Sequence, residues 1–439
     1  MTEKKLEDAT PPAAAGSGLS RRSILKGTAA ATGLAVGSGA ITGFPTIWAQ
    51  NIKDITLNHT GMSYSTLIDI ARQASADLGF TVEMSVTDHP GLTNRMINDP
   101  GSIDVADAEI WQAKVFVPQG VTQAVDVKRI NLWDEFTPIY TKGEFLGRPV
   151  SRAGDSPFEF MYRDAIDGTT FVEGPTEFAT FMPGVFNADT LGIRADLVGR
   201  PIEKWGDLFS EEFKGKAAIQ NIPTIGIMDA IMACESAGIV TYGDKGNPTR
   251  EELEATIAKL IELKRAGHWR ALWNTFDESV NLMASGEVVI QSMWSPAVTA
   301  VRTQGINCVY QPLKEGYRGW GNGLALMSHL EGIKLDAAYE YLNWYVSGWT
   351  GGFIAKQGYY ISVPTTARDH LTENEWGFFY EGKPATEDIV SPSGVKTNSA
   401  GEVRDGGSFE DRFANVGVWN NLMDEAEFLF AKWNEFNAA

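Results

Sequence analysis

The sequence lacks the residue patterns that usually bind metals or build catalytic centres. It contains only two cysteines, Cys234 and Cys308, and its five histidines are widely separated. No C-x-x-C, H-x-x-x-H or haem-attachment spacing occurs, and no G-x-S-x-G motif places a nucleophile beside a base. Both cysteines lie in apolar contexts, which are compatible with one disulfide or with two unpaired thiols. We therefore expect no cofactor, no metal and no enzyme activity.

The chain also lacks an excess of positive charge. Its formal net charge is −19, and it becomes −21 when residues 1–49, with five basic and three acidic side chains, are set aside. Such acidity would repel the phosphates of nucleic acid, so we expect no nucleic-acid partner. The remaining 390 or so residues are too many for one hydrophobic core and enough for two lobes.

The N-terminal residues predict an export signal. Arg21 and Arg22 lie in an S-R-R-x-hydrophobic-L-K pattern that runs from Ser20 to Lys26. A glycine- and alanine-rich apolar run follows and leads to a candidate cleavage site at residues 47–49. The alternative, a membrane helix, would need roughly 20 strongly apolar residues. We therefore predict a twin-arginine signal peptide, the twin-arginine export machinery as a partner, and a periplasmic location.

Residues 52–106 alternate between strand and helix patterns. This order predicts an α/β lobe around a mainly parallel sheet, in which ligands collect beyond the carboxyl ends of the strands. Those ends place residues 60–64 and 107–111 on the candidate ligand surface. The predicted elements are strands over 52–58, 80–86 and 103–106 and a helix over 63–78.

A second lobe follows after a loop-rich stretch. Thr249, with Glu251 and Glu252 behind it, predicts a well-capped helix start. After Pro364 the sequence shows little regularity before its last helix. The predicted elements of this part are helices over 224–237, 249–266, 335–346 and 420–433 and strands over 288–293 and 324–327.

Four stretches carry a resemblance to a known family. They are W-G-D-L…F-K-G-K at 205–216, M-A-S-G-E-V…M-W at 283–294, L-K-E-G…W-G-N-G-L-A at 313–325, and A-A-Y-E-Y-L-N-W at 337–344. In this order and spacing they resemble the solute-binding proteins of ABC importers, most of all the spermidine/putrescine-binding group. The resemblance implies a type II periplasmic-binding-protein fold. Such a fold has two α/β lobes, each a mainly parallel sheet flanked by helices, joined by crossing strands and able to close on a ligand.

The same resemblance implies a division of the chain. After the signal peptide at 1–49, lobe 1 would comprise residues 50–182 with 300–366, and lobe 2 residues 183–299. Residues 367–439 would pack on the lobes. The expected partners are a small organic solute and the permease subunits of an ABC importer in the inner membrane, and we expect a monomer.

Family members that bind polyamines hold the methylene chain between aromatic rings and cap the ammonium groups with carboxylates. Trp294 and Trp320 align with the stacking tryptophans of the family, and Tyr64 and Trp111 match aromatic positions of the first lobe more loosely. The glycines around Trp320 predict an exposed ring. Asn322 stands where the family has an acidic residue, and it could donate or accept hydrogen bonds. Asp107, Glu109, Asp277 and Glu278 are candidate replacement carboxylates, and Glu109 is the one included among the predicted site residues.

Other residues favour a different ligand. Arg318, beside Trp320, could clamp a carboxylate, sulfonate or phosphonate. Backbone N–H groups at the helix start near Thr224 could bind an anion. The adjacent Tyr359 and Tyr360 resemble a pair in iron-binding relatives, but we predict that they lie in the core or hinge, because no carboxylate or histidine accompanies them.

The sequence thus predicts the substrate-binding component of an ABC importer. A polyamine or other amine-bearing solute is the first expectation. A zwitterionic or anionic solute, such as an amino acid derivative, organic acid, phosphonate or sulfonate, is the alternative. The alternative from another class is an exported enzyme with an unrecognised active site.

Overall fold

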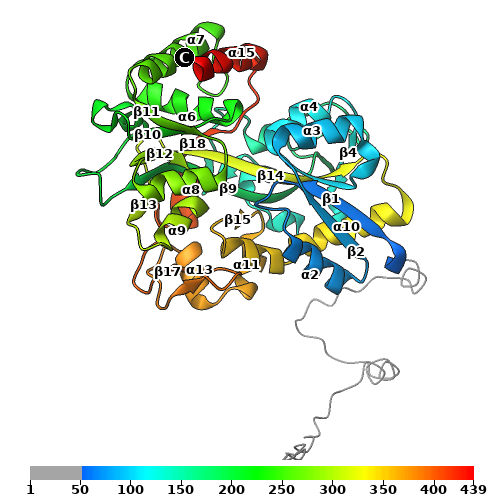
Figure 1. Ribbon diagram of the computed structural model, residues 1–439. Helices are drawn as coiled ribbons and strands as arrows, with labels where there is room; N and C mark the ends of the chain where they lie inside the picture. Colours follow the sequence, from blue (N-terminus) through cyan, green and yellow to red (C-terminus); the bar gives the residue numbers. More distant parts are fainter. Residues whose placement is uncertain (1–51) are drawn as a thin grey trace, which may run out of the picture. The chain divides into compact units, whose positions relative to one another are not determined.

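The computed structural model describes residues 52–439, so the predicted signal peptide lies outside the described residues. These residues form an α/β fold built on a 12-stranded sheet with helices packed around it (Figure 1). Of the helices described, none is sufficiently long and apolar to cross a membrane.

The sheet contains two groups of parallel strands. In the first group, β1 pairs in parallel with both β2 and β3, and in the second group, β10 pairs in parallel with both β11 and β12. The strands are β1 (Thr56–Gly61), β2 (Thr81–Val86), β3 (Val105–Glu109), β10 (Ala217–Gln220), β11 (Trp269–Trp273) and β12 (Ile290–Met293). Each group is the sheet of one lobe.

Two long strands join the groups. β9 (Met182–Arg194) pairs antiparallel with β12 of the second group, and β14 (Tyr317–Met327) pairs antiparallel with β3 of the first. β9 and β14 also pair with each other, so the chain crosses between the lobes along two adjacent strands. Every residue of both strands is buried. Two lobes, each with a parallel group of strands, are joined by crossing strands, which confirms the predicted type II periplasmic-binding-protein fold.

Helices pack against each group of strands (Figure 1). Those beside the first group are α2 (Ile68–Leu78), α3 (His89–Asn98), α10 (Gly332–Tyr345) and α11 (Trp349–Ala355). Those beside the second group are α6 (Pro223–Ser236), α7 (Arg250–Arg265), α8 (Phe276–Ser285) and α9 (Ser295–Arg302). Buried apolar side chains form one large cluster in the first lobe and two clusters in the second.

Smaller elements complete the fold. β13 and β15 pair with β9, and β4 pairs with β14, so they extend the large sheet. The short elements are β4 (Thr122–Gln123), β5 (Val125–Asp126), β6 (Glu144–Phe145), β7 (Arg148–Pro149), β8 (Phe178–Ala179), β13 (Cys308–Gln311), β15 (Tyr360–Ile361), α4 (Ala113–Phe116) and α5 (Pro138–Thr141).

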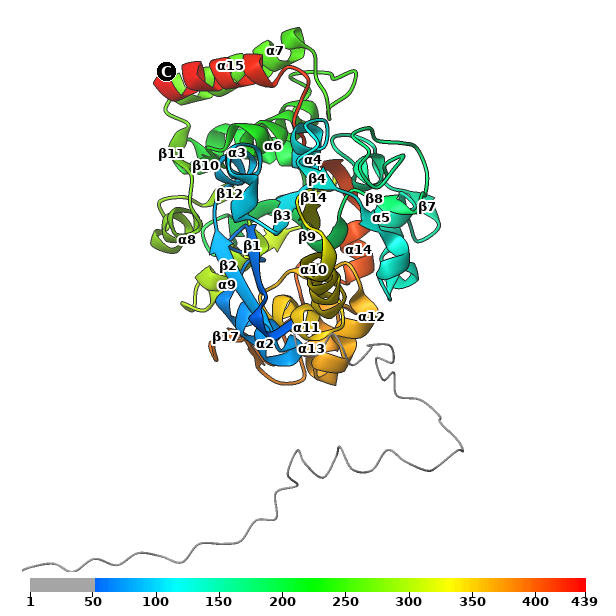
Figure 2. The same cartoon turned by 90° about the vertical axis from the view of Figure 1, so that its right-hand side faces the viewer.

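The C-terminal segment is more regular than its sequence indicates. β18 pairs in parallel with β14, and α15 lies beside α7 at the far end of the second lobe (Figure 2). Trp433 of α15 donates from Nε1 to Asn221 Oδ1 at 2.8 Å. The elements are α12 (Pro364–Ala367), α13 (Glu373–Phe379), β16 (Ile389–Val390), β17 (Lys396–Asn398), α14 (Phe409–Phe413), β18 (Val416–Trp419) and α15 (Ala426–Ala438).

Most predicted elements are present, with ends that differ by a few residues. The predicted cap of α7 is confirmed: Thr249 Oγ1 accepts the Glu252 N–H at 3.3 Å, and the Glu252 carboxylate accepts the Thr249 N–H at 2.8 Å. The first strand starts only at Thr56, because Ile52–Asp54 forms a 3-10 turn. The last helix, predicted from residue 420, begins at Ala426.

Candidate functional site

Strand β14 presents three predicted site residues on one face. Side chains alternate between the two faces of a strand, so Arg318, Trp320 and Asn322 project from the same side. The residues between and beyond them are Gly319, Gly321 and Gly323. The sequence therefore places its polar and aromatic groups on one face and bare backbone on the other.

The glycine face is closely packed by aromatic side chains. A Cβ atom on Gly321 would lie 2.0 Å from the Tyr140 hydroxyl, and one on Gly323 would lie 2.1 Å from the Phe181 ring. The ring of Trp320 is only 6% exposed, so the expectation of an exposed ring is wrong. The glycines let other rings approach the back of the strand, and they do not open the front to solvent.

A cavity of about 590 Å³ lies at the carboxyl ends of both groups of parallel strands. Each of the six strands is followed by, or ends at, residues that line it, as expected for ligand sites in α/β sheets. The residues are Met62–Tyr64 after β1, Thr87–His89 after β2, Glu109 at the end of β3, Ile222 and Ile225 after β10, Asn274–Phe276 after β11, and Trp294 after β12.

The cavity brings together five of the eight predicted site residues. They are Tyr64, Glu109, Trp294, Arg318 and Trp320. The other three, Trp111, Thr224 and Asn322, are buried and do not line the cavity. Trp294 and Trp320, from the second lobe and from the crossing strand, therefore face one shared space.

Aromatic rings form much of the cavity wall. Tyr64, Trp320 and Tyr359 make a mutually contacting group, with ring centroids 4.7 to 5.9 Å apart. Trp294 is half-buried on the second lobe. Its ring packs edge-to-face with Trp273, with the ring centroids 4.9 Å apart. Tyr359 and Tyr360 both belong to the buried core of the first lobe, as predicted, and Tyr359 also lines the cavity.

An ion cluster lies beneath the aromatic wall. Arg318 donates from Nε to Asp229 Oδ1 at 2.7 Å, from one terminal nitrogen to Asn420 Oδ1 at 2.7 Å, and from the other to Asp189 Oδ2 at 3.4 Å. Trp320 Nε1 donates to the same Asp189 oxygen at 2.9 Å. Each nitrogen of Arg318 therefore already has a partner within the protein, which weakens its prediction as an anion clamp.

Burial shapes the electrostatics of this cluster. It raises the pKa of Asp189 to about 6, although Arg318 and the Tyr310 hydroxyl oppose the shift. It also raises the pKa of Asp229. Burial alone would lower the pKa of Arg318, but the two carboxylates outweigh it and raise that pKa above its ordinary value. One cation thus stands between two buried acids.

Glu109 also lines the cavity, as do Asp88 and Asp189. Its Oε1 accepts from Asn420 Nδ2 at 2.7 Å, and its Oε2 accepts from Trp111 Nε1. His89 Nε2 lies 3.9 Å from the same Oε2. Trp111, which is buried and does not line the cavity, therefore holds the carboxylate of Glu109 in position.

The start of α6 offers little to an anion. Its first residue is Pro223, which has no N–H, and the N–H groups of Ile225 and Gly226 both bond to the carbonyl of Ile222, at 3.0 and 2.7 Å. Ile222 and Ile225 turn apolar side chains toward the cavity, whereas Thr224 does not line it.

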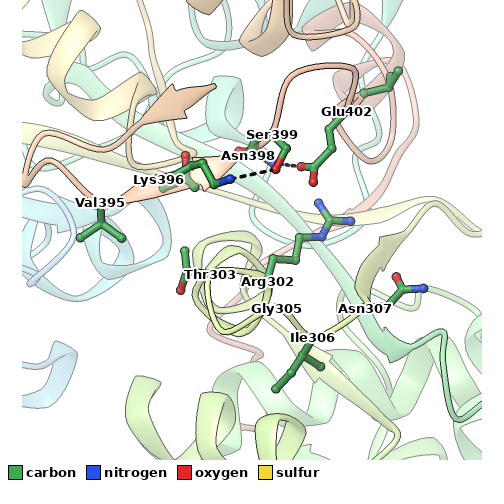
Figure 3. A pocket seen from close by; sticks show the side chains of 12 residues that line it. Arg302, Thr303, Gly305, Ile306, Asn307, Val395, Lys396, Asn398, Ser399 and Glu402 are labelled. Carbon is green, nitrogen blue, oxygen red and sulfur yellow. Dashed lines mark hydrogen bonds between the residues drawn. The ribbon is translucent and has the colours of Figure 1, made fainter. Parts of the chain in front are cut away.

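A second hollow of about 780 Å³ lies between the loop after α9 and the segment around β17 (Figure 3). Its polar groups pair among themselves: Asn398 Nδ2 donates to Glu402 Oε2 at 3.1 Å, and Lys396 Nζ donates to Ser399 Oγ at 3.3 Å. No predicted site residue and no aromatic ring lines it. We therefore take the cavity between the lobes as the candidate site.

Within residues 52–439, no group of three or more His, Cys, Asp or Glu side chains is placed to hold a metal ion. Cys234 and Cys308 are both buried and unpaired, so they do not form a disulfide with each other. Burial raises the pKa of each thiol to about 12.

Sequence reasoning missed several residues of the cavity. Asp189 is a carboxylate inside a 13-residue strand that is buried throughout, and an acid within such a run was a usable signal. Asn420 reaches the site only through the pairing of β18 with β14, which the sequence did not indicate. The other missed lining residues include His89, Phe276 and Gln357.

Comparison by sequence identifies a family for most of the chain. The profile of the bacterial extracellular solute-binding protein family matches residues 69–377. No curated protein matches the sequence.

Comparison by structure finds the same fold in several solved proteins. One is described as a spermidine/putrescine ABC transporter from Listeria monocytogenes, with a TM-score of 0.60 and 12% identity over 87% of this chain and 98% of that one. A spermidine/putrescine ABC transporter substrate-binding protein, PotD, from Streptococcus pneumoniae has a TM-score of 0.56 and 12% identity over 87% and 99%. The binding protein MotA of A. tumefaciens, in complex with glucopine, has a TM-score of 0.50 and 16% identity over 87% and 99%.

Proposed function

Because the chain belongs to the bacterial extracellular solute-binding family, we propose that it is the substrate-binding component of an ABC importer and that it captures a small amine-bearing solute, such as a polyamine. The proposal includes twin-arginine export to the periplasm, a monomeric state and delivery of the solute to permease subunits in the inner membrane. It also includes the division into lobes at residues 50–182 with 300–366 and 183–299, with residues 367–439 packed on them.

The observation that carries the ligand class is the composition of the cavity lining. Tyr64, Trp320 and Trp294 offer aromatic rings to the cavity, and Glu109 and Asp189 offer carboxylates. The faces of aromatic rings attract cations, and a desolvated carboxylate pairs with an ammonium group. A methylene chain with a protonated amine suits both kinds of group.

The lobes provide the mechanism of capture. Walls from two lobes meet around one cavity, and β9 and β14 cross between the lobes. A ligand that contacts both walls favours the closed arrangement, because those contacts exist together only when the lobes are shut. The closed form is what a permease would recognise.

One observation favours the alternative of a zwitterionic solute. Gln357 lines the cavity, and its Nε2 is buried without a hydrogen-bond partner among residues 52–439. A solute that carries an acceptor, such as a carboxylate, in addition to its amine would satisfy this donor. Arg318 is a weaker anion site, because its nitrogens already bond to Asp229, Asn420 and Asp189.

Thermal unfolding of the purified protein with single solutes tests the proposal, because a ligand that binds only the folded state raises Tm. The panel contains diamines and polyamines, amino acids, organic acids and phosphonates. We expect amines, with or without an acceptor group, to raise Tm. A rise with simple acids and none with amines would contradict the ligand class.

A further inference from the structure

A chain of buried hydrogen bonds runs from the cavity into the first lobe. Tyr64, which lines the cavity, donates its hydroxyl to Asn322 Oδ1 at 2.9 Å, and Asn322 donates from Nδ2 to Asp107 Oδ1 at 3.0 Å. Behind Asp107, His59 Nε2 lies 3.7 Å from Oδ2, and His59 Nδ1 is 2.7 Å from the Tyr341 hydroxyl. Apart from Tyr64, these residues have no exposed surface.

The hydrogen bonds from Tyr64 through Asn322 to Asp107 each have a fixed donor and a fixed acceptor. Asp107 Oδ1 accepts from Asn322 Nδ2, so the amide nitrogen of Asn322 faces Asp107. The amide oxygen of Asn322 then faces Tyr64 and can only accept. The single hydroxyl hydrogen of Tyr64 is therefore used within the protein, and its oxygen keeps lone pairs for another donor.

The charge state of Tyr64 agrees with these donor and acceptor roles. Burial raises the pKa of Tyr64 well above its ordinary value, and the carboxylates of Glu109 and Asp107 raise it further. The side chain thus remains a neutral phenol at physiological pH. Its hydroxyl oxygen can accept a further hydrogen bond, and the ring centroids of Tyr64 and Trp320 lie 4.7 Å apart.

The neighbouring hydrogen-bond donors are also used by acceptors within the protein. Trp320 Nε1 and a terminal nitrogen of Arg318 donate to Asp189, and Asn420 Nδ2 donates to Glu109. Tyr64, Trp320, Glu109 and Asp189 thus offer the cavity ring faces and acceptor oxygens, while Gln357 adds a donor with no partner among residues 52–439. Ring faces attract any cation, including a quaternary ammonium ion, but acceptor oxygens gain a hydrogen bond only from a cation that carries N–H groups.

Resting on the amine-binding function proposed above, we propose that Asp107 and Asn322 fix Tyr64 as an acceptor, and that Tyr64 thereby selects ligands with primary or secondary ammonium groups over quaternary ammonium ligands. Asp107 and Asn322 are positioning residues in this proposal, since they act through Tyr64.

Calorimetric titration with two probes tests this selection. The probes are 1,4-diaminobutane and its fully N-methylated, doubly quaternary analogue. Removing the acceptor in Tyr64→Phe should weaken binding of the diamine about tenfold, as for one hydrogen bond to a charged group, and change that of the quaternary probe by less than about twofold. The ratio of the two affinities is the readout, because a general loss of cavity structure would weaken both probes.

Two further variants locate the effect. Asn322→Ala removes the partner that holds the hydroxyl hydrogen. Like Tyr64→Phe, it should lower the ratio of the diamine affinity to the affinity for the quaternary probe. Tyr341→Phe is the matched control: it deletes a hydroxyl at the inner end of the chain, away from the cavity, and should leave the ratio unchanged. If Asn322→Ala does not fold, the two tyrosine variants still decide.

The outcomes separate the two proposals. If the wild-type protein binds the diamine and the Tyr64→Phe ratio equals the wild-type ratio, the selection by Tyr64 is wrong while the amine-binding function stands. If the protein binds neither probe and binds an organic acid, the amine-binding function is wrong, and the inference fails with it.

Discussion

Arg318 and Asp229 form a buried ion pair that connects strand β14 with helix α6 of the second lobe. The Nε–Oδ1 distance is 2.7 Å, and neither side chain is more than 1% exposed. Asp189 lies 3.4 Å from the same guanidinium, so one arginine serves two buried acids. This ion pair holds β14, the strand that carries Trp320, against helix α6.

Arg318→Met should strongly destabilise the protein. It would leave two buried carboxylates without their cation, and breaking a buried pair in this way typically costs about 3–5 kcal/mol. Urea denaturation measures the loss. Adding Asp229→Asn to Arg318→Met should restore part of the stability, whereas Arg72→Met, which breaks an exposed pair with Asp69, should cost no more than about 1 kcal/mol. Equal effects at Arg318 and Arg72 would contradict the buried pair.

Trp294→Leu and Trp320→Leu should each weaken binding of an amine about tenfold or more, because each removes a ring face worth about 1–2 kcal/mol to a desolvated cation. Calorimetric titration of the diamine measures both. Trp349→Leu is the matched control, since Trp349 is half-buried and stacks on Phe353 outside the cavity. An unchanged affinity in both cavity variants would remove these rings from the site.

Binding of amines should weaken as the pH falls from 7 to 5. Asp189 has a pKa of about 6 and loses its negative charge over this range. Asp189→Asn should bind more weakly at pH 7 and show a flatter pH profile. A profile for Asp189→Asn that equals the wild-type profile would show that another group titrates.

The same shift predicts the opposite trend for stability. The folded-state pKa of Asp189 lies above its ordinary value of 3.8, so the folded protein binds this proton more tightly than the unfolded chain does. Ionised Asp189 therefore costs stability above pH 6, and this cost disappears as the pH falls from about 6 toward 4. The difference in unfolding free energy between wild type and Asp189→Asn, followed against pH, isolates the contribution.

Thr249→Ala should lower the unfolding free energy by about 1 kcal/mol, the usual contribution of a helix N-cap. Thr249 accepts the Glu252 N–H at the start of α7, and alanine leaves that N–H without its partner. Thr249→Ser keeps the hydroxyl and should behave like wild type in urea denaturation. A serine variant as unstable as the alanine variant would assign the effect to the lost methyl group instead.

Gly321→Ala should cost about 1–3 kcal/mol, as overpacking of a close contact does, and should weaken ligand binding without touching the ligand. The added Cβ would meet the Tyr140 hydroxyl at 2.0 Å and displace the strand that carries Trp320. Gly101→Ala is the control, because a Cβ there meets no atom within 4 Å. Normal binding and stability in Gly321→Ala would show that the strand yields easily.

Local signals in the sequence predicted the fold well. Alternating and helical patterns identify the strands and helices of both lobes, and the Thr249 cap fixes the start of α7 almost to the residue. The helix predicted from residue 63 begins only at Ile68, because residues 62–64 turn into the cavity instead. Local propensity does not report such a contact with a distant element.

The site was predictable only where a single strand or strand end carries it. Trp320 and Trp294 follow from their places on β14 and after β12. The partners of Arg318 could not be predicted, since Asp229 and Asn420 are 89 and 102 residues away along the chain. Pairings at such separation depend on how α6 and the C-terminal segment pack on the crossing strands.

The position of the cavity at the ends of six strands affects how the ligand selectivity of such a receptor could change. The lining after β1, β2 and β11 lies in connecting segments, whereas Glu109, Asp189, Arg318 and Trp320 lie in strands of the sheet. Short grafts into the loops after β1, β11 or β12 could therefore retune selectivity while the scaffold stays intact. Directed libraries confined to those loops should yield many folded variants with new preferences.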